Sequence, residues 1–380
     1  MIYLNNAATT YPKFNEVNQA VASALSNGFM FCNRDSVEYT KVAETIFKLR
    51  QCLSNMFHAQ KPHDICLLTN DTLALNMLIF GQNFKKGDIV ITSPFEHNSV
   101  SRPLCKTKAT IEFVNINKGI VDINHLKKLV KNPKVKCCIL SHASNVTGDV
   151  INAKEVGSVL HENKIPFILD VAQSAGYVDI DVEKWNVSAL TFSGHKGLGG
   201  PQGTGGFYIR KGFDIEPILF GGTGNHSSEV NNPIVFPDSF EVGTPAVHDL
   251  IGLYAGLLKI QKNENYKTDI LSLTQYLHDN LKQIPNVVCY FGQNQKKTPV
   301  VSFNIKGLKA KQVGEMLAQK NIVCRTGYHC SAWGIEKIKA EAYGGTVRLS
   351  CGYFNTRQEI DYTLKIIKET CENLAQKNKI

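Results

Sequence analysis

Short apolar runs alternate with helix-length amphipathic segments over residues 63–210. Each run is apolar along its whole length, and strands of this kind, separated by helices, are typical of a mostly parallel sheet covered on both faces. The predicted strands are "DICLLT", "DIVITS", "IEFVNI", "KCCILSHA", "PFILDV", "ALTFSG" and "GGFYIR", and the predicted helices include 71–81, 122–131 and 152–163. Such a sheet places ligands at the carboxyl ends of its strands.

The pattern changes after "FEVGTPAVHDL". A long helical stretch covers about 245–281, followed by the runs "VVCYF", "PVVSFNI", "NIVCRT" and "TVRLSC", a helix near 309–320 and a last helix from about 356. We therefore predict an α/β protein with a large, mostly parallel seven-stranded sheet and a smaller C-terminal α/β domain. The predicted divisions are an N-terminal segment packing on the small domain, 1–12, a large domain, 13–250, a connecting helix, 251–282, and a small domain, 283–380.

Composition agrees with an ordinary soluble protein of one or two domains. The 380 residues are 43% hydrophobic and 20% charged, enough for a large core. No basic segment with an apolar stretch opens the chain, and no apolar run approaches the roughly 18 residues of a membrane span. We expect a cytoplasmic protein without a membrane partner. The net charge of +9 comes from scattered lysines, which we interpret as a solvated surface, so no nucleic-acid partner is expected.

The cysteines indicate neither a disulfide scaffold nor a metal site. There are 11 of them, an odd number, and none stands in C-x-x-C spacing. Several lie in apolar runs and are predicted to be buried thiols. No Cys/His set has metal-ligand spacing, and no phosphate-loop motif is present.

The candidate chemistry gathers at the ends of predicted strands. Asp170 ends the apolar run of "PFILDVAQSAG", where a carboxylate is costly unless a charge pairs with it. A protonated ring nitrogen would supply that charge, with Gln173 near a ring substituent; a helix-capping role is the alternative for Asp170 alone. Lys196 lies in "TFSGHKGLGGPQGTGG", whose glycines we interpret as clearance for a flat cofactor bound to this lysine. Ser193 and His195 are candidate phosphate ligands.

Two further strand ends complete this set. "LLTNDTLALNMLIFG" predicts a strand and then a helix whose first turn holds Asp71 and Thr72. A helix N-terminus with a hydroxyl binds phosphate, and Asp71 fits there if its backbone faces the phosphate. "SPFEHNSV" places His97 where an imidazole would stack on a planar ring. The set suits pyridoxal phosphate (PLP), which needs an acidic partner for its ring nitrogen.

From "IYLNNAATTYPK" to "VRLSCGYFNTRQEID", the chain resembles the class V aminotransferase-fold PLP enzymes of the cysteine desulfurase and selenocysteine lyase type. The most specific parts are "DVAQSAG", "SGHKGLGGPQGTGG", "FEVGTP", "RTGYHC" and "VRLS" with "YFNT". The resemblance implies a fold-type I PLP-dependent transferase in which Lys196 holds PLP, Asp170 pairs with its ring nitrogen and His97 stacks on its ring. The further cofactor-binding residues that it implies are Asp71, Thr72, Asn145, Gln173, Ser193, His195 and Thr244. Thr244 would reach the site of a neighbouring subunit, which implies a homodimer with shared active sites.

One cysteine stands apart from the others. Cys330 lies in "VCRTGYHCSAWGIEKIKAEAYGG", a polar stretch that we expect to be an accessible loop, and Arg325 and His329 would favour its thiolate. Taken alone it is an ordinary thiol. The resemblance implies that Cys330 is catalytic, together with Lys196 and His97, and accepts the substrate's sulfur. It also implies that the substrate is bound by Asn145, Arg348, Arg325 and Ala7; a guanidinium such as that of Arg348 suits a carboxylate.

The predicted function is that of a PLP-dependent cysteine desulfurase. It would convert L-cysteine, or a related sulfur or selenium amino acid, to L-alanine and leave a persulfide on Cys330 for a sulfur-acceptor protein. The alternatives are a selenocysteine lyase, a C–S β-lyase or an aminotransferase of the same fold, and a non-catalytic partner-binding protein that keeps PLP.

The sequence departs from the resembled family at four places. Asn5 stands where the family has an acid, and Asn70-Asp71 replaces a Gly-rich turn before Thr72. Ser331-Ala332-Trp333 follows the cysteine instead of the frequent Ala-Pro, and "NGFMFCNRDSVEYT" has no Gly/His-rich loop. These departures leave PLP chemistry in place and the substrate open.

Overall fold

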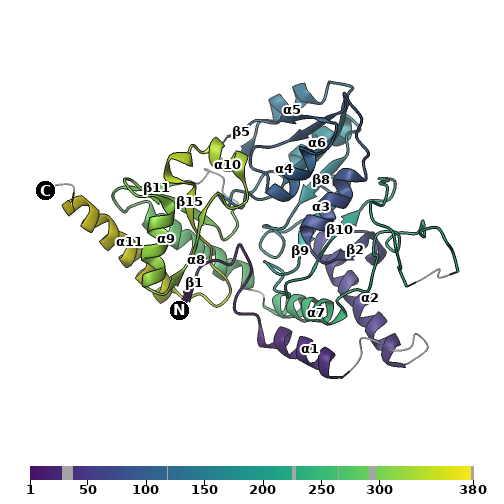
Figure 1. The fold of residues 1–380 in the computed structure, drawn as a ribbon, viewed down its shortest axis with the longest axis horizontal. Coiled ribbons are helices and arrows are strands. Elements are labelled where there is room, and N and C mark those ends of the chain that lie inside the picture. Colours follow the sequence, from purple (N-terminus) through teal and green to yellow (C-terminus); the bar gives the residue numbers. More distant parts are fainter. Residues whose placement is uncertain (28–36, 118, 225–227, 264, 291–296, 378–380) are drawn as a thin grey trace.

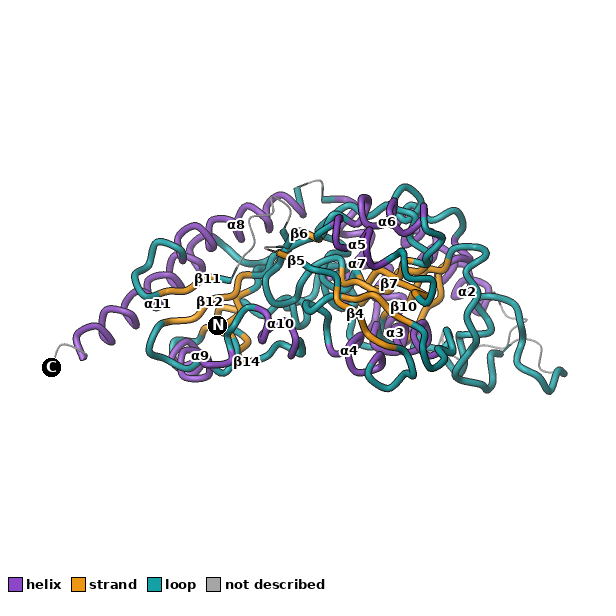
Figure 2. The backbone as a smooth tube through the Cα atoms, turned by 90° about the horizontal axis from the view of Figure 1, so that it is seen from above, coloured by secondary structure: helices purple, strands orange, loops and turns teal. Residues whose placement is uncertain are grey.

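The computed structural model describes residues 1–27, 37–117, 119–224, 228–263, 265–290 and 297–377. Its elements form a large part and a small part along the long axis of the molecule (Figure 1). The N-terminus lies among the strands of the small part, and the C-terminal helix extends from that part (Figure 2). Residues 28–36, in the stretch that lacks the Gly/His-rich loop, lie outside the described residues.

The large part is built around one seven-stranded sheet. In spatial order the strands are β2 (Ile65–Leu68), β10 (Gly205–Ile209), β9 (Ala189–Ser193), β8 (Phe167–Asp170), β7 (Val135–Ser141), β3 (Ile89–Thr92) and β4 (Thr110–Phe113). Strand β10 is antiparallel to both of its neighbours, and every other pair in this sheet is parallel. The predicted mostly parallel α/β fold is confirmed.

Helices cover both faces of this sheet, and alternate strand residues enter two separate apolar cores. One core contains Leu140 and Leu169 together with residues of α2 (Val37–Phe57), α5 (Ile123–Leu129), α6 (Ala153–Glu162) and α7 (Val247–Lys262). The other contains Ile139 and Ile168 together with residues of α3 (Asp71–Phe80) and α4 (Asn98–Leu104). Because both faces are buried, the strands are apolar throughout. No helix among the described residues has the length and apolar character needed to cross a bilayer.

The predicted elements between residues 63 and 210 are present with small differences. The predicted helices 71–81, 122–131 and 152–163 correspond to α3, α5 and α6. The run "IEFVNI" is divided between β4 and β5 (Ile116–Asn117), which pairs with β6 (Ile120–Val121). Two further short elements are α1 (Asn15–Ser26), which packs on α7, and the 3₁₀ turn η1 (Pro62–Asp64).

The small part is built around an antiparallel sheet of β11 (Val287–Cys289), β12 (Val301–Ile305), β15 (Thr346–Leu349) and β14 (Arg325–Gly327). Its core includes residues of α8 (Tyr266–Leu281), α9 (Ala310–Gln319) and α11 (Arg357–Lys377). Helix α10 (Ala332–Lys337) and the turn η2 (Glu341–Tyr343) lie between β14 and β15 in the chain. The run "NIVCRT" supplies β14 and also β13 (Ile322–Val323), which pairs in parallel with β1 (Ile2–Tyr3).

The prediction of one connecting helix over 251–282 is wrong. The structure has two helices here, because α7 ends at Lys262 and α8 begins at Tyr266. Asn263 Oδ1 accepts a hydrogen bond from the Asn265 N–H (3.1 Å), and such a local bond offers the backbone an alternative to the helix. Helix α7 contributes to the core of the large part and α8 to that of the small part. The domain boundaries drawn from the sequence stay predictions.

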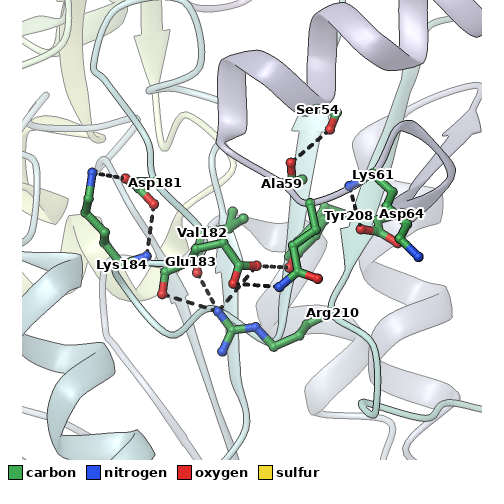
Figure 3. Close-up of polar contacts among 11 residues, drawn as sticks. Ser54, Ala59, Lys61, Asp64, Asp181, Val182, Glu183, Lys184, Tyr208 and Arg210 are labelled. Carbon is green, nitrogen blue, oxygen red and sulfur yellow. Dashed lines mark hydrogen bonds and ion pairs between the residues drawn. The ribbon is translucent and has the colours of Figure 1, made fainter.

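At the amino edge of the large sheet, polar side chains find partners within the chain (Figure 3). Tyr208 Oη donates a hydrogen bond to Glu183 Oε1 (3.1 Å). Arg210 Nη2 donates to the Val182 carbonyl (2.8 Å) and lies 3.8 Å from Glu183 Oε1. These contacts tie the segment before β9 to the end of β10.

Candidate functional site

A cavity of about 220 Å³ lies at the carboxyl edge of the large sheet. Its walls come from the ends of β7, β8 and β9, the starts of α3 and α4, the N-terminal segment, and β14 and β15 of the small part. The predicted site residues that line it are Ala7, Asp71, Thr72, His97, Asn145, Asp170, Gln173, Ser193, His195, Lys196, Arg325 and Arg348. The structure therefore brings together side chains that lie up to about 340 residues apart in the sequence.

Asp170 is the last residue of β8 and is 5% exposed. Its Oδ1 accepts a hydrogen bond from the Ala172 N–H (2.8 Å). Burial raises the pKa of the Asp170 carboxyl, and the Ala172 N–H and Lys196 act in the opposite direction. Turns, and no helix, follow at 172–177, so the helix-capping alternative does not apply. A carboxyl in this place suits the proton of a basic ring nitrogen.

Lys196 follows β9 and is half-buried at the cavity. Burial lowers its pKa, while the carboxylates of Asp71 and Asp170 raise it. A lysine with a lowered pKa supplies more of the neutral amine, which is the nucleophilic form.

The glycines around Lys196 have a packing role. A Cβ at Gly197 would lie 2.2 Å from the Ala175 carbonyl oxygen, and one at Gly194 would lie 2.2 Å from Thr204 Oγ1. These two residues therefore let the Lys196 segment pack closely against its neighbours. The sequence-based interpretation that the glycines of this stretch clear space for a cofactor stays a prediction.

His97 directly precedes α4 and caps it. The Ser99 N–H donates to His97 Nδ1 (3.1 Å), so the proton of the neutral ring resides on Nε2. Burial, and after it the charge of Lys196, lowers the pKa of His97 to about 3. A flat, neutral imidazole at the cavity wall suits stacking on a planar ring.

The start of α3 forms the part of the wall that suits a phosphate. The first backbone N–H groups of a helix lack partners within it, and the helix dipole favours an anion there. Thr72 Oγ1 lies 2.8 Å from Ser99 Oγ, and Ser193, at the end of β9, lines the same cavity. Burial lowers the pKa of His195 to about 4, so this imidazole is neutral at pH 7.

Arg348, on β15, lies in the part of the cavity wall that the small part supplies, and it is 1% exposed. Its Nη1 donates to the Asn145 carbonyl (3.0 Å) and its Nη2 to Asn5 Oδ1 (3.4 Å). Burial lowers the pKa of Arg348 to about 9, which leaves it charged at pH 7. Because Asn5 stands in place of the family's acid, this hydrogen bond does not neutralise the guanidinium. Arg348 is therefore suited to bind a carboxylate.

Hydrogen bonds join the three segments that enclose the cavity. Gln173 Nε2 donates to the Ala7 carbonyl (3.1 Å), and the Ala7 N–H donates to Ser350 Oγ (2.8 Å). Asn145 Nδ2 donates to the His329 carbonyl (2.5 Å). The N-terminal segment and the segment before Cys330 are thereby fixed against the large part.

Cys330 lies beside the cavity, in a turn between β14 and α10, and is half-buried. Arg325, which lines the cavity, donates from Nη2 to Cys330 Sγ (3.0 Å). The Cys330 carbonyl accepts from the Asn98 N–H (2.6 Å), and Ser331 Oγ donates to the Glu96 carbonyl (3.0 Å). The thiol is therefore held in a fixed place next to the guanidinium of Arg325.

The expectation that His329 favours the Cys330 thiolate is wrong. His329 Nε2 lies 2.8 Å from Thr346 Oγ1, and burial lowers the pKa of His329 well below its usual value. The ring is neutral at pH 7 and adds no positive charge beside the thiol. Neither the contact nor the burial is visible in the spacing of the sequence.

Thr244 does not line this cavity. It is exposed and borders a separate pocket together with Arg50 and Thr223. Its expected contact with a neighbouring subunit's site stays a prediction.

Sequence reasoning missed three polar residues that support the site. Ser99 contacts His97, as described above. Ser141 ends β7 opposite Asp170 and donates from Oγ to Glu96 Oε2 (2.7 Å). Glu96 is 1% exposed, and burial raises its pKa to about 8. The signals were present, since Glu96 and Ser99 flank His97 in "SPFEHNSV" and Ser141 ends a predicted strand.

Three polar atoms at the cavity have no hydrogen-bond partner in the part of the chain that the structure describes: Asp71 Oδ1, His195 Nδ1 and Arg348 Nε. Buried polar atoms normally have a partner, so their presence together at one cavity indicates a ligand. With the carboxyl of Asp170, the start of α3 and the neutral ring of His97, they fit a flat cofactor that carries a phosphate and a basic ring nitrogen.

Comparisons with known proteins identify the family. The model of the family "Aminotransferase class-V" matches residues 2–363. A probable cysteine desulfurase of Pyrococcus abyssi is 31% identical over 98% of this chain and 95% of its own length, and one of Synechocystis sp. is 31% identical over 97% and 91%. The apo structure of a cysteine desulfurase from Thermococcus onnurineus NA1 aligns with a TM-score of 0.90 at 29% identity, covering 98% of this chain and 95% of that one. The chain belongs to the aminotransferase class-V family.

Proposed function

We propose that this protein is a PLP-dependent cysteine desulfurase, which converts L-cysteine to L-alanine and leaves a persulfide on Cys330. The observation that carries the proposal is the thiol of Cys330, held 3.0 Å from the guanidinium of Arg325, beside a cavity that also contains Lys196 and Asp170. The relatives named probable cysteine desulfurase support the same activity.

In this proposal the large part holds the cofactor. Lys196 binds PLP covalently, Asp170 holds the proton of the ring nitrogen, and His97 stacks on the ring. Thr72, Ser193 and His195 bind the phosphate. When bound, PLP supplies an electron sink that stabilises negative charge at the substrate's Cα.

The small part and Lys196 then act on the substrate. Arg348 and Asn145 orient the amino acid by its carboxylate, and Ala7 and Arg325 border it. The amine of Lys196 removes the proton from Cα, as a lysine with a lowered pKa is suited to do. His97 carries its proton on Nε2 and serves proton transfer near the sulfur as a neutral ring.

The sulfur transfer balances without an added oxidant. The Cys330 thiolate attacks the sulfur of the substrate, so an S–S bond forms as the C–S bond breaks. The electron pair of the broken bond stays with carbon, which takes up a proton, and the products are alanine and a Cys330 persulfide. Cys330 is half-buried beside the cavity. A sulfur-acceptor protein would take the outer sulfur of its persulfide.

We further propose a homodimer with shared sites, in which Thr244 reaches the cofactor phosphate of the neighbouring subunit. Thr244 is exposed in this chain, and the segment before it carries the exposed apolar side chains of Phe220, Val230 and Ile234. Exposed apolar residues gathered on one segment mark an interaction surface. We also propose a cytoplasmic location, which agrees with the free thiols of all ten cysteines that the structure describes.

The test is a measurement of alanine and sulfide from purified protein and L-cysteine with a reductant. We expect equal amounts of both, loss of both in Cys330→Ala, and no change in Cys105→Ala, whose thiol is exposed and lies outside the cavity. Pyruvate and ammonia in place of alanine would show β-elimination. Turnover of selenocysteine alone would show a selenocysteine lyase.

A further inference from the structure

Several hydrogen-bond donors of the N-terminal segment converge on one carbonyl oxygen, that of His195. The donors within hydrogen-bond distance of it are the Thr10 N–H (3.1 Å), Thr9 Oγ1 (3.2 Å), Thr10 Oγ1 (3.2 Å) and Lys13 Nζ (2.9 Å). Because a carbonyl oxygen has only two lone pairs, this acceptor has more donors around it than it needs. The N-terminal segment therefore holds this carbonyl more firmly than a single backbone contact would.

The carbonyl belongs to the peptide bond between His195 and Lys196. Because a peptide unit is planar, holding its oxygen also holds the backbone nitrogen and the Cα of Lys196. On the other side of the residue, the Lys196 carbonyl accepts from the Gly199 N–H (2.9 Å). Both peptide units that flank Lys196 are thus fixed, and the N-terminal segment fixes one of them.

Lys13 is the donor in this group that attachment of the segment does not explain. The partners of its Nζ among the described residues are uncharged oxygens, the His195 carbonyl (2.9 Å) and Thr10 Oγ1 (2.7 Å). Burial lowers the pKa of Lys13 to about 8. A partly buried ammonium with no carboxylate among its partners costs free energy, and the Thr10 N–H alone already attaches the segment to this carbonyl.

The same segment also contacts the residue that we propose to bind the substrate's carboxylate. Asn5 Oδ1 accepts from Arg348 Nη2 (3.4 Å), and the Leu4 N–H donates to the Val323 carbonyl (2.8 Å). One short stretch of chain therefore contacts the guanidinium of Arg348 near its start and the backbone of Lys196 near its end. In the proposed function, these two residues act on the carboxylate and the Cα of one substrate molecule.

We propose that Lys13 is a positioning residue, whose ammonium holds the His195 carbonyl and so sets the amine of Lys196 at the Cα of a substrate that Arg348 binds. The inference rests on the proposed function, because it takes Lys196 to move the α-proton. Lys13 does not line the cavity, so it acts through Lys196. Proton transfer needs the two heavy atoms within about 3 Å, so a small displacement of the amine lowers the rate of the reaction more than the affinity for the substrate.

The test compares Lys13→Met, which keeps the length of the side chain and removes its donors, with Lys13→Arg, which keeps a cation and its donors. The control is Lys259→Met, which breaks a surface ion pair with Glu16 (2.7 Å) that joins α1 to α7. The full-length proteins are compared in kcat and KM for L-cysteine, in the visible circular dichroism of the bound cofactor, and in hydrogen exchange of the peptide that contains Lys196. Thermal unfolding checks that each variant is folded.

We expect kcat of Lys13→Met to fall about tenfold while KM stays within about twofold of the wild type. The dichroism of the cofactor should weaken and the Lys196 peptide should exchange faster, because the backbone of Lys196 is held less firmly. Lys13→Arg should recover most of kcat, and Lys259→Met should match the wild type in all three measurements.

Thr10→Val tests the same contact if Lys13→Met does not fold, because it removes the hydroxyl that lies between Lys13 and the carbonyl; its kcat should fall about threefold. Wild-type kcat, dichroism and exchange in the folded variant would overturn the inference and leave the proposed function intact. A loss that Lys259→Met reproduces would also overturn it, since any loosening of the N-terminal part would then have the same effect. A wild type that forms no alanine from L-cysteine would overturn the proposed function and the inference with it.

Discussion

The two edges of the large sheet carry polar side chains in different ways. At the amino edge, Tyr208 Oη and Arg210 Nη2 are hydrogen-bonded to the segment that precedes β9, and Arg210 Nε has no partner among the described residues. At the carboxyl edge, Asp71 Oδ1, His195 Nδ1 and Arg348 Nε lack partners among the described residues. Tyr208 lies on β10 and His195 follows β9, its neighbour in the sheet, whereas Asp71 begins α3 and Arg348 lies on β15 of the small part.

The difference shows which edge is built for a ligand. Burial shifts pKa values at both edges, but at the carboxyl edge several of the shifted groups, Asp71 and His195 among them, line one cavity. Perturbed titratable groups gathered in one cavity mark functional sites. We therefore expect substitutions at the carboxyl edge to change turnover and substitutions at the amino edge to change stability.

The largest effect is expected for Lys196→Ala. Without the amine, the protein loses both the covalent link to PLP and the base that removes the α-proton, and alanine formation should fall about 10⁴-fold. Borohydride reduction should fix the cofactor on the Lys196 peptide of the wild type only. Lys184→Ala, at the amino edge, is the control and should keep full turnover, because its Nζ forms a surface ion pair with Asp181 (2.8 Å) away from the cavity.

Asp170→Asn is expected to lower turnover about 100-fold, because a neutral amide loses a charge-assisted hydrogen bond worth about 3 kcal/mol. PLP should remain bound, which absorbance of the purified variant measures. Asp64→Asn is the matched change at the amino edge, where the carboxyl accepts from the Lys61 N–H (3.0 Å). Equal turnover of Asp170→Asn and Asp64→Asn would show that the carboxyl of Asp170 does not face the ring nitrogen.

Arg348→Lys should lower kcat/KM about tenfold, because an ammonium cannot hold a carboxylate by two parallel hydrogen bonds. The loss should appear mainly in KM for L-cysteine, since the contact is made in the bound substrate and in the transition state. Arg210→Lys, at the amino edge, should leave KM unchanged. A change confined to kcat would place Arg348 away from the substrate's carboxylate.

The smallest effect is expected for Tyr208→Phe. It removes the hydrogen bond to Glu183 and should lower the free energy of unfolding by about 1 kcal/mol, as measured by urea denaturation. Turnover per folded molecule should not change. A loss of turnover without a loss of stability would contradict the expectation that the amino edge affects stability and the carboxyl edge affects turnover.

The sequence predicted the strands well because their apolar runs follow from burial on both faces. It did not predict the break between α7 and α8, because the hydrogen bond between Asn263 Oδ1 and the Asn265 N–H, which accompanies the break, is not visible in the apolar pattern. The run "NIVCRT" was expected to be one strand. In the structure it forms two, because β13 pairs with β1 of the N-terminal segment and β14 pairs with β15.

For the site, the residue types at strand ends were informative, and their orientations were not. Asp170 and Lys196 stand out because a charged side chain at the end of an apolar run is costly to bury unless it has a partner. His329 looks suitable beside Cys330 in sequence, but its ring turns to Thr346. Ser141 and Glu96 gave weaker signals because their role depends on the register of β7 with β8.

If Cys330 takes the sulfur of L-cysteine, the mass of the Cys330 peptide records the transfer. The wild type is treated with L-cysteine in the absence of reductant, alkylated and digested, and the Cys330 and Cys105 peptides are compared. We expect the Cys330 peptide to gain the mass of one sulfur atom, the Cys105 peptide to keep its mass, and one alanine to form for each sulfur gained. Alanine formed while the Cys330 peptide keeps its mass, or sulfur found on another cysteine in Cys330→Ala at the wild-type rate, would contradict this transfer.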